Sequence, residues 1–351
     1  MSKDNFAAES AVYRRSSPIP PENILIDNHG RRINYVRLSV TDRCNLRCIY
    51  CMPEKMRFLP RKEILSYEEM TRLMQILAGM GINKVRLTGG EPFVRKDMMD
   101  FLWELRSISG IEKIHLTSNG VLTGQYVPEL KKLDIASINL SLDSLDKERF
   151  FKITRRDDFE KVMQCFHKII DHDIPLKVNA VLMEEHNTDD IIPMTNLTKE
   201  YPVDVRFIEE MPFNGTDGGK PKLRWNFKRI YEQLQSEYPG IYKLDDEPAS
   251  TSMNYGIPGH RGTVGIIAGF SRTFCGSCNR IRITAKGMLQ TCLYGEGVLD
   301  VKQLLRSDAS DEDIATEIRC AVGKRFKDGW EAEKARKKIT EISESMSLIG
   351  G

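Results

Sequence analysis

The sequence predicts an α/β fold, an incomplete (β/α)6 TIM-like barrel followed by a C-terminal part with a different pattern. Between about Asn34 and Met211, short runs of β-forming residues alternate with helical patterns. Strand–helix repetition of this kind implies a parallel sheet or barrel. One face of most of these strands is polar or basic, whereas the interior of a closed barrel is usually apolar. The predicted interior is therefore an open lumen.

Six strands are predicted, two fewer than a full barrel has. Their ranges are Asn34–Val40, Asn83–Thr88, Lys113–Ser118, Ala136–Leu142, Leu176–Leu182 and Asp204–Ile208. Helical patterns lie between them, and the clearest runs from Ser66 to Met80. Ser66 and Glu69 have capping-box spacing at its start, and Gly81 follows its end.

Alternate residues of a strand point to opposite faces. In the first strand the apolar set is Val36, Leu38 and Val40, and the polar set is Tyr35, Arg37, Ser39 and Thr41. The polar face continues in the later strands with Lys84, Arg86, Thr88, Ser137, Asn139, Ser141, Lys177, Asn179 and Arg206. Buried charges without partners are very costly. We therefore expect the lumen to hold a polar, anionic ligand; an open sheet with one solvated face is the alternative.

After Met211 the alternation stops. Segments 214–220 and 255–265 are rich in glycine and turn residues and predict loops, whereas Val264–Ala268 and Arg280–Thr284 predict short strands. Segment 300–338 is helical and highly charged, as in a solvated outer layer. The predicted organisation is a polar N-terminal extension at 1–30, the partial barrel at 31–212, and a C-terminal domain at 213–351 that closes the open side of the barrel.

The composition excludes several classes of protein. The 351 residues carry a net charge of only +2, so no polybasic character for nucleic acid or membrane is present. No apolar run is long enough for a membrane span, and the polar N-terminal residues lack the features of an export signal. We therefore expect a cytoplasmic protein. Six of the eight cysteines form two groups, which favours metal over disulfides. We expect the other two, Cys165 and Cys320, to be inert core residues in helices.

The first cysteine group is Cys44, Cys48 and Cys51, a CxxxCxxC pattern directly after the first strand. Three thiolates on one loop can bind three irons of a [4Fe–4S] cluster and leave the fourth open for a substrate. A structural zinc site is the alternative, but such sites usually close with four ligands, and no fourth Cys or His lies nearby. The pattern therefore favours an iron–sulfur cluster.

The second group is Cys275, Cys278 and Cys292, again three cysteines with no obvious fourth. Spacing alone leaves zinc and iron–sulfur equally open. Arg280 and Arg282 alternate along the next strand and share one face. Paired guanidinium groups suit phosphate or a purine face, although surface arginines in a strand are the alternative.

The first motif, with Tyr50 before its last cysteine, resembles the signature of the radical S-adenosylmethionine superfamily. Gly89, Gly90 and Glu91, followed by proline, resemble that superfamily's GGEP motif, whose backbone and acid hold the methionine amino group of S-adenosylmethionine. The resemblance implies that the open iron binds S-adenosylmethionine and that its cleavage gives a 5′-deoxyadenosyl radical. Beside such a core, the second trio is better interpreted as a second [4Fe–4S] cluster.

A narrower resemblance rests on Arg37–Cys44, Cys51–Pro53, Arg86–Pro92, Thr117–Gly120, Phe274–Arg282 and the terminal Gly350 and Gly351. Together these segments are similar to the MoaA family, the GTP 3′,8-cyclases that begin molybdopterin biosynthesis. The resemblance implies that the radical takes a hydrogen from ribose C3′ of GTP and that C3′ then attacks guanine C8. It also implies a glycine tail that enters the active site.

The same resemblance implies a role for each matched residue. The S-adenosylmethionine site is formed by Tyr50, Gly89, Gly90, Glu91, Ser141 and Met211. GTP is contacted by Arg37, Arg86, Thr117, Lys177, Arg280, Ile281 and Arg282, with Lys84 and Arg206 as weaker candidates. The residues implied in catalysis are Arg37, Arg86, Gly350 and Gly351.

The implied partners are an electron donor such as reduced flavodoxin or ferredoxin, a downstream cyclic pyranopterin monophosphate synthase, and a second copy of the chain. Two alternatives stay open at this point. One is a peptide-modifying radical enzyme with auxiliary clusters, which usually has more C-terminal cysteines. The other is a non-catalytic zinc-binding scaffold.

Overall fold

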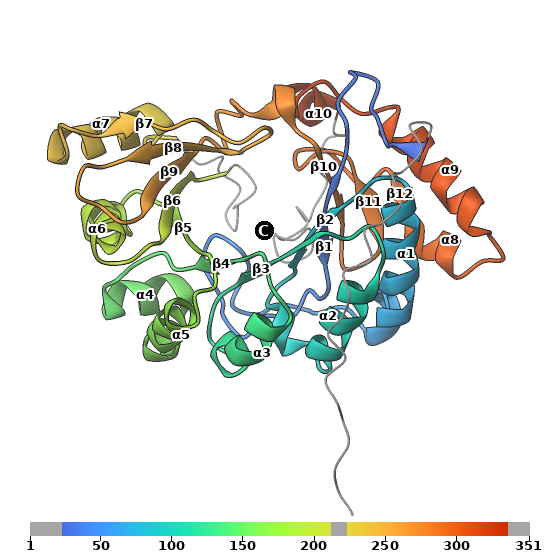
Figure 1. Ribbon diagram of the computed structural model, residues 1–351, viewed down its shortest axis with the longest axis horizontal. Coiled ribbons are helices and arrows are strands. Elements are labelled where there is room, and N and C mark those ends of the chain that lie inside the picture. Colours follow the sequence, from blue (N-terminus) through green and yellow to red (C-terminus); the bar gives the residue numbers. More distant parts are fainter. Residues whose placement is uncertain (1–22, 212–222, 336–351) are drawn as a thin grey trace, which may run out of the picture.

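The computed structural model describes residues 23–211 and 223–335, and its centre is one curved sheet (Figure 1). Within these residues the sheet has 12 strands in the order β12-β11-β10-β1-β2-β3-β4-β5-β6-β9-β8-β7. The first six strands are β1 (Tyr35–Ser39), β2 (Lys84–Thr88), β3 (Lys113–Ser118), β4 (Ser137–Ser141), β5 (Leu176–Leu182) and β6 (Asp204–Glu209). All six predicted strands are thereby confirmed, with shifts of one residue at some ends.

The C-terminal part extends this sheet at both edges. Its strands are β7 (Tyr242–Lys243), β8 (Ser252–Gly256), β9 (Thr263–Ile267), β10 (Arg280–Ile283), β11 (Met288–Gln290) and β12 (Leu299–Asp300). β10 pairs in parallel with β1, and β9 pairs in parallel with β6. Together with β1 to β6, they complete a run of parallel strands, flanked on each side by an antiparallel hairpin. The last six strands therefore lie beside the barrel strands and not in a separate sheet.

Helices cover the outer, convex side of the sheet (Figure 1). Those of the barrel are α1 (Tyr67–Gly79), α2 (Met98–Ser107), α3 (Val127–Lys132), α4 (Lys147–Thr154), α5 (Phe159–Asp171) and α6 (Ile191–Glu200). The C-terminal part contributes α7 (Phe227–Glu237), α8 (Val301–Leu305), α9 (Asp311–Val322) and α10 (Gly329–Ala335). None of the helices in the described part of the chain is both long and apolar enough to cross a membrane.

The predicted helix start at Ser66 is confirmed. The Ser66 hydroxyl accepts a hydrogen bond from the Glu69 backbone N–H at 3.2 Å, and the Glu69 carboxylate accepts one from the Ser66 N–H at 2.7 Å. This reciprocal capping box satisfies two N–H groups that have no partner within the helix. Helix α1 then packs Leu73 and Leu77 fully buried against the sheet.

The two faces of the sheet differ as the alternation predicts. Val36, Leu38 and Val85 are fully buried in the hydrophobic core with the helices. Burying each such side chain stabilises the fold by about 1.5–3 kcal/mol. Most of the polar set lines a cavity on the concave side, whereas Ser39, Thr41 and Thr88 are buried outside its lining. The prediction of a polar lumen is therefore confirmed, and the open solvated sheet is excluded.

The prediction of a single loop at 255–265 is wrong. Segment 255–265 is not one loop, because β8 and β9 form an antiparallel hairpin in which Tyr255 pairs with Val264 and only 257–262 connects them. Gly265 fits the strand because a Cβ there would lie 2.2 Å from the Ser252 hydroxyl oxygen. The loop predicted at 214–220 lies outside the described residues.

Cys320 is also not a core residue. Cys165 is buried in α5, as predicted, but Cys320 is exposed on α9. That helix buries Ile314, Ile318 and Val322, which recur at the four-residue spacing of one helix face. Cys320 is two positions from Ile318 and therefore lies off this face.

The described part of the N-terminal extension is packed against the fold. Leu25 is 1% exposed, and the backbone N–H of Leu25 bonds to the Met80 carbonyl at the end of α1. Ile26 and Arg32 form an isolated antiparallel bridge. This segment runs along the second cysteine loop, as its contacts below show.

Candidate active site

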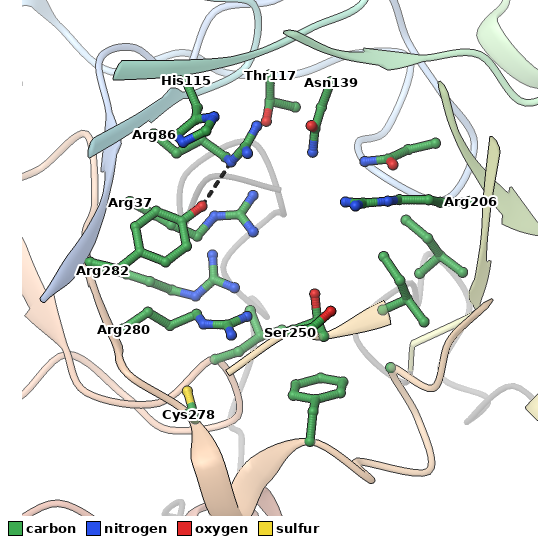
Figure 2. Close-up of a pocket in the computed structure, with 18 of the residues that line it drawn as sticks. Arg37, Arg86, His115, Thr117, Asn139, Arg206, Ser250, Cys278, Arg280 and Arg282 are labelled. Atoms are coloured by element: carbon green, nitrogen blue, oxygen red, sulfur yellow. Dashed lines mark hydrogen bonds between the residues drawn. The ribbon is translucent and has the colours of Figure 1, made fainter. Parts of the chain in front are cut away.

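A cavity of about 550 Å³ fills the concave side of the sheet. All six cysteines of the two trios line it, together with polar residues from each of β1 to β6 and from β10. Figure 2 shows Arg37, Arg282 and Arg280 stacked along one wall, with Arg206 opposite them. The two cysteine groups are far apart in sequence, and the fold brings both to the same chamber.

Strand register builds the basic wall. Arg37 lies directly opposite Arg282 on one side and Arg86 on the other, so three arginines form one cross-strand row. The next row places Tyr35 between Arg280 and Lys84. Like charges opposite each other on neighbouring strands destabilise a sheet. Four arginines and a lysine on adjoining strands therefore favour a site that binds an anion.

Tyr35 lies at the centre of this wall. Its hydroxyl accepts a hydrogen bond from Arg86 Nε at 2.7 Å, drawn as the dashed line in Figure 2. The Lys84 ammonium lies 4.9 Å from the centre of the Tyr35 ring. Burial favours the neutral phenol, but Arg86, Arg37 and Arg280 outweigh it and lower the pKa of Tyr35 to about 7.

The positive charges of neighbouring guanidinium groups also lower the pKa of two arginines in this wall. Burial, followed by the charge of Arg282, lowers the pKa of Arg37 well below its ordinary value. Burial and then Arg280 lower the pKa of Arg282 in the same way. Burying these positive charges beside one another is costly, and a bound polyanion would offset that cost.

The opposite wall carries less net charge. Lys177 Nζ bonds to the Asp204 carboxylate at 3.0 Å, and Arg206 lies 3.8 Å from the same carboxylate. Despite burial, these cations lower the pKa of Asp204. One carboxylate therefore partly neutralises both cations, and the predicted anion site is more strongly basic on the β1, β2 and β10 side.

A strip of uncharged polar groups joins the two walls. His115 Nδ1 bonds to the Ser137 hydroxyl at 2.7 Å. The buried atoms His115 Nε2, Thr117 Oγ1, Asn139 Oδ1 and Asn179 Oδ1 have no hydrogen-bond partner within the described residues. Burial and then Arg86 lower the pKa of His115 to about 2, so the ring is neutral. Buried polar atoms without partners are costly, and this strip is suited to a ligand that supplies them.

The first cysteine trio lies on the loop after β1. Backbone bonds from Arg47 N–H to Thr154 O and from Ile49 N–H to Ile153 O fix this loop against α4. The Cys44 sulfur accepts bonds from the Leu46 N–H at 3.4 Å and from Asn119 at 3.6 Å. Burial, Asp143 and the other two thiols raise the pKa of Cys48. The three sulfur atoms therefore share one electrostatic environment.

Gly89 and Gly90 pack against this loop closely enough to exclude a side chain. A Cβ at Gly90 would lie 2.2 Å from the Arg43 carbonyl oxygen. Gly89 has φ +154°, and a Cβ there would lie 2.5 Å from the Thr41 carbonyl oxygen. Both glycines line the cavity, so the turn brings bare backbone to a ligand site.

Glu91, in contrast, does not line the cavity. Its carboxylate is fully buried behind the wall and accepts bonds from the Asn119 and Phe93 backbone N–H groups at 2.7 and 3.2 Å. It also accepts a bond from the Ser118 hydroxyl. Burial raises its pKa to about 7. In this structure Glu91 shapes the turn, and the sequence motif did not separate that role from direct ligand contact.

Three other predicted cofactor residues, Tyr50, Ser141 and Met211, line the same cavity as the first trio. Asp143, which no sequence motif indicated, accepts bonds from the Tyr50 hydroxyl and the Val181 N–H, both at 2.9 Å. Burial raises its pKa to about 6. Its position two residues after Ser141, just beyond the end of β4, was the only available signal.

The second trio is enclosed by segments that the sequence does not connect with it. Arg325, which precedes α10, donates to the Cys278 sulfur at 2.9 Å and to the Cys278 carbonyl at 3.1 Å. Arg31 donates to the Cys275 carbonyl at 3.0 Å. Both arginines pair with the buried Asp27. Burial favours the neutral thiol of Cys278, but the charges of Arg280 and Arg325 outweigh this effect and lower its pKa.

For three predicted residues the structure shows no side chain at the cavity wall. One is buried in the core, and two lie outside the described residues. Ile281 is fully buried in the hydrophobic core, so a ligand could meet only its backbone. Gly350 and Gly351 lie outside the described residues. The remaining predicted substrate residues, including Lys84, Lys177 and Arg206, line the cavity.

Each trio fits a [4Fe–4S] cluster by the chemistry of its donors. All six are free cysteines, each trio lines the chamber, and thiolates are the ligands of such clusters. Among the described residues, no three His, Cys, Asp or Glu side chains lie close enough together to hold a single metal ion. A four-iron cluster is larger than one ion, and its thiolates lie correspondingly farther apart.

Comparisons with family models give two matches in tandem. Residues 38–198 match the radical SAM superfamily, and residues 203–330 match the molybdenum cofactor synthesis C-terminal family. The first match holds the Cys44, Cys48 and Cys51 trio, and the second holds Cys275, Cys278 and Cys292. The division between the two falls at the start of β6.

Curated relatives agree with these matches. "Molybdenum cofactor biosynthesis protein 1" of Bos taurus is 41% identical over 314 residues, 87% of this chain and 48% of the relative. The chain thus spans about half the length of that relative. "GTP 3′,8-cyclase" of Desulforamulus reducens is 39% identical over 338 residues, 93% of this chain and 100% of the relative.

A solved structure shares the fold. SuiB of Streptococcus suis, bound to S-adenosylmethionine, superposes with a TM-score of 0.58 over 83% of this chain and 69% of that chain. Its sequence is 16% identical. At this identity the likeness concerns the fold, and it agrees with a partial barrel whose sheet is mostly parallel.

Proposed function

The chain belongs to the GTP 3′,8-cyclase family of radical SAM proteins, and from that premise we propose that it converts GTP to (8S)-3′,8-cyclo-7,8-dihydroguanosine 5′-triphosphate. This is the first step of molybdopterin biosynthesis. One observation carries the proposal: two three-cysteine groups line a single cavity, and a wall of arginines joins them. A triphosphate is the kind of anion that such a wall can neutralise.

We propose that S-adenosylmethionine binds at the end of the cavity nearest the first trio. Cys44, Cys48 and Cys51 would hold the cluster there, with one iron left for the ligand. The bare backbone of Gly89 and Gly90 is close to that loop, and Tyr50 is oriented by its bond to Asp143. When bound, the cluster and S-adenosylmethionine supply the 5′-deoxyadenosyl radical chemistry.

GTP is proposed to occupy the chamber between the trios. Arg37, Arg86, Arg280 and Arg282 would bind its phosphates, with Lys84, Lys177, Arg206, Thr117 and the backbone of Ile281 around them. The open iron of the second cluster, held by Cys275, Cys278 and Cys292, would anchor the guanine edge. A rigid sheet that holds ribose C3′ near the radical source solves a proximity problem, because well-oriented reactants react far faster than free ones.

Further proposals follow from the family. A one-electron donor such as reduced flavodoxin or ferredoxin would reduce the clusters, and a cyclic pyranopterin monophosphate synthase would use the product. We also propose a homodimer, a cytoplasmic location and domains at 31–212 and 213–351. All eight cysteines are free within the fold, which is consistent with a reducing compartment; one relative, from Arabidopsis thaliana, carries "mitochondrial" in its name.

The test begins with anaerobic purification and reconstitution. We expect a brown protein with about eight irons, two four-iron clusters' worth. Incubated with GTP, S-adenosylmethionine and dithionite, it should form 3′,8-cyclo-GTP. A fully reconstituted protein that gives no such product would end the assignment, and a colourless protein with stoichiometric zinc would support the scaffold instead.

The peptide-modifying alternative is not favoured. The likeness to SuiB at 16% identity concerns the fold alone, whereas the cyclase of Desulforamulus reducens matches along its full length. Only Cys320 follows Cys292 in this chain, and it is exposed on α9. The described residues therefore offer no further cysteine cluster of the kind that auxiliary sites need.

A further inference from the structure

Arg325 makes an unusual contact with one of the second trio's sulfur atoms. Its guanidinium donates to Cys278 Sγ at 2.9 Å and, with its other terminal nitrogen, to the Cys278 carbonyl at 3.1 Å. Most arginines of the cavity wall point toward the lumen, where an anion would bind (Figure 2). Arg325 instead reaches the loop that carries the cysteine.

Two residues of the N-terminal segment, Asp27 and His29, hold Arg325 in place. Its side chain is 3% exposed and lies 3.5 Å from the carboxylate of Asp27, which is fully buried. The Arg325 carbonyl is itself bonded to the His29 ring at 3.0 Å. A buried, paired guanidinium in a fixed fork geometry loses little entropy when it donates to a sulfur. The N-terminal segment therefore orders the residue that contacts Cys278.

Arg31 offers a matched comparison within the same cluster of residues. It also pairs with Asp27, at 2.6 Å, and it also bonds to the cysteine loop. Its partner there is the Cys275 carbonyl at 3.0 Å and not a sulfur. Arg31 also donates to the Phe326 and Lys327 carbonyls at 3.0 and 2.8 Å. The two arginines thus share an anchor and a loop, but on that loop Arg31 reaches a carbonyl oxygen and Arg325 also reaches a sulfur.

We infer that Arg325 is a positioning residue that tunes the second cluster, raising its reduction potential by hydrogen bonding to the Cys278 thiolate. Hydrogen bonds to cluster sulfurs are among the factors that set these potentials. Reduction adds one electron and one negative charge to the cluster and its thiolates. A cationic donor at the sulfur stabilises that state more than the oxidised one, so its loss should make reduction harder.

The inference rests on the proposed function, because it requires a cluster at the second trio. The test uses the full chain with Cys44, Cys48 and Cys51 changed to alanine, so that only the second cluster gives a signal. In this background we compare Arg325→Gln, Arg325→Lys and the matched control Arg31→Gln. Each protein is reconstituted, its iron is counted, and its potential is measured by dithionite titration followed by electron paramagnetic resonance.

We expect about four irons in every protein. Arg325→Gln should lower the ratio of reduced to oxidised cluster at a fixed potential by roughly tenfold, which is about 59 mV for one electron. Arg325→Lys should shift it less and in the same direction, because an ammonium cannot serve both acceptors and Asp27 at once. Arg31→Gln should leave the ratio unchanged.

Several outcomes would overturn the inference. One is an unchanged potential in both Arg325 variants; another is an equal shift in Arg31→Gln, which would assign the effect to loop anchoring. Loss of iron from both Arg325 variants, with circular dichroism showing a folded chain, would make the residue a structural requirement only. If the parent with the intact second trio binds no iron, the proposed function itself fails, and that result is distinct from the others.

Discussion

At the scale of single residues, the site depends on the positive charge that neighbouring strands concentrate on one wall of the cavity. The rows built by Arg37, Arg86, Arg280 and Arg282 face one lumen, and the phenol of Tyr35 lies within these rows. Such a wall binds a polyanion because the ligand offsets repulsion that already exists in the empty fold. Variants that remove one cation should therefore weaken substrate binding and leave the clusters in place.

Arg282→Ala is expected to weaken GTP binding by about 10- to 100-fold, because a charge-assisted hydrogen bond contributes about 1.5–3 kcal/mol. Iron content should stay unchanged, since arginine cannot ligate iron. Anaerobic calorimetry with GTP gives the affinity. Arg72→Ala is the matched control, because Arg72 pairs with Asp311 on the outer surface. Unchanged GTP affinity in Arg282→Ala would refute the phosphate clamp.

Tyr35 should make GTP binding depend on pH. Its folded pKa of about 7 lies below the ordinary value near 10, so the site holds a phenolate above pH 7. A phenolate repels phosphate, and the affinity of the wild type should fall by up to about tenfold per pH unit above 7. Tyr35→Phe removes the titration. The ratio of the two affinities cancels the titration of GTP itself, and a ratio that stays constant from pH 6.5 to 8.5 would contradict the account.

Most wall residues could be predicted from alternation, because a strand's period of two is visible in sequence. Arg325 and Asp143 could not. Arg325 is 47 residues from Cys278 and lies near it only after the chain has folded around the second loop. Glu91 shows the opposite limit, since its motif implies a ligand contact, whereas its carboxylate is buried and accepts bonds from the Asn119 and Phe93 backbone.

At the scale of elements, the barrel is completed by strands that no local pattern assigns to it. The sequence predicts segments near β9 and β10 as short strands, and both exist. Their pairing with β6 and β1 is a long-range contact, and periodicity carries no information about partners. That pairing places Arg280 and Arg282 beside Tyr35 and Arg37, so the anion site depends on it.

The turn at Gly90 is the element on which the first site depends most. In Gly90→Ala, the added methyl would meet the Arg43 and Asp42 backbone at 2.2 to 2.9 Å. Because backbone must move, we expect loss of S-adenosylmethionine binding and of about four irons. Gly79→Ala at the end of α1 is the control, since a Cβ there would meet nothing within 4 Å apart from its chain neighbours and its own helix backbone. Normal iron and S-adenosylmethionine affinity in Gly90→Ala would show that the close approach is not required.

At the scale of the whole molecule, the N-terminal segment, the barrel and the C-terminal part enclose one chamber. Gly350 and Gly351, outside the described residues, are proposed to complete it. Deleting them should abolish turnover and leave the iron content and the thermal unfolding midpoint unchanged, because two glycines add little to a core. Assays of product and iron on the truncated chain check this, and full activity would remove the tail from the mechanism.

The central claim is that the chamber holds ribose C3′ of GTP against the radical source at the first trio. The most direct measurement uses GTP deuterated at C3′, with mass spectrometry of the 5′-deoxyadenosine formed by the reconstituted enzyme. We predict one deuterium in the 5′-deoxyadenosine of each turnover. 5′-Deoxyadenosine without deuterium, formed alongside product, would contradict the account, because the hydrogen would then come from elsewhere.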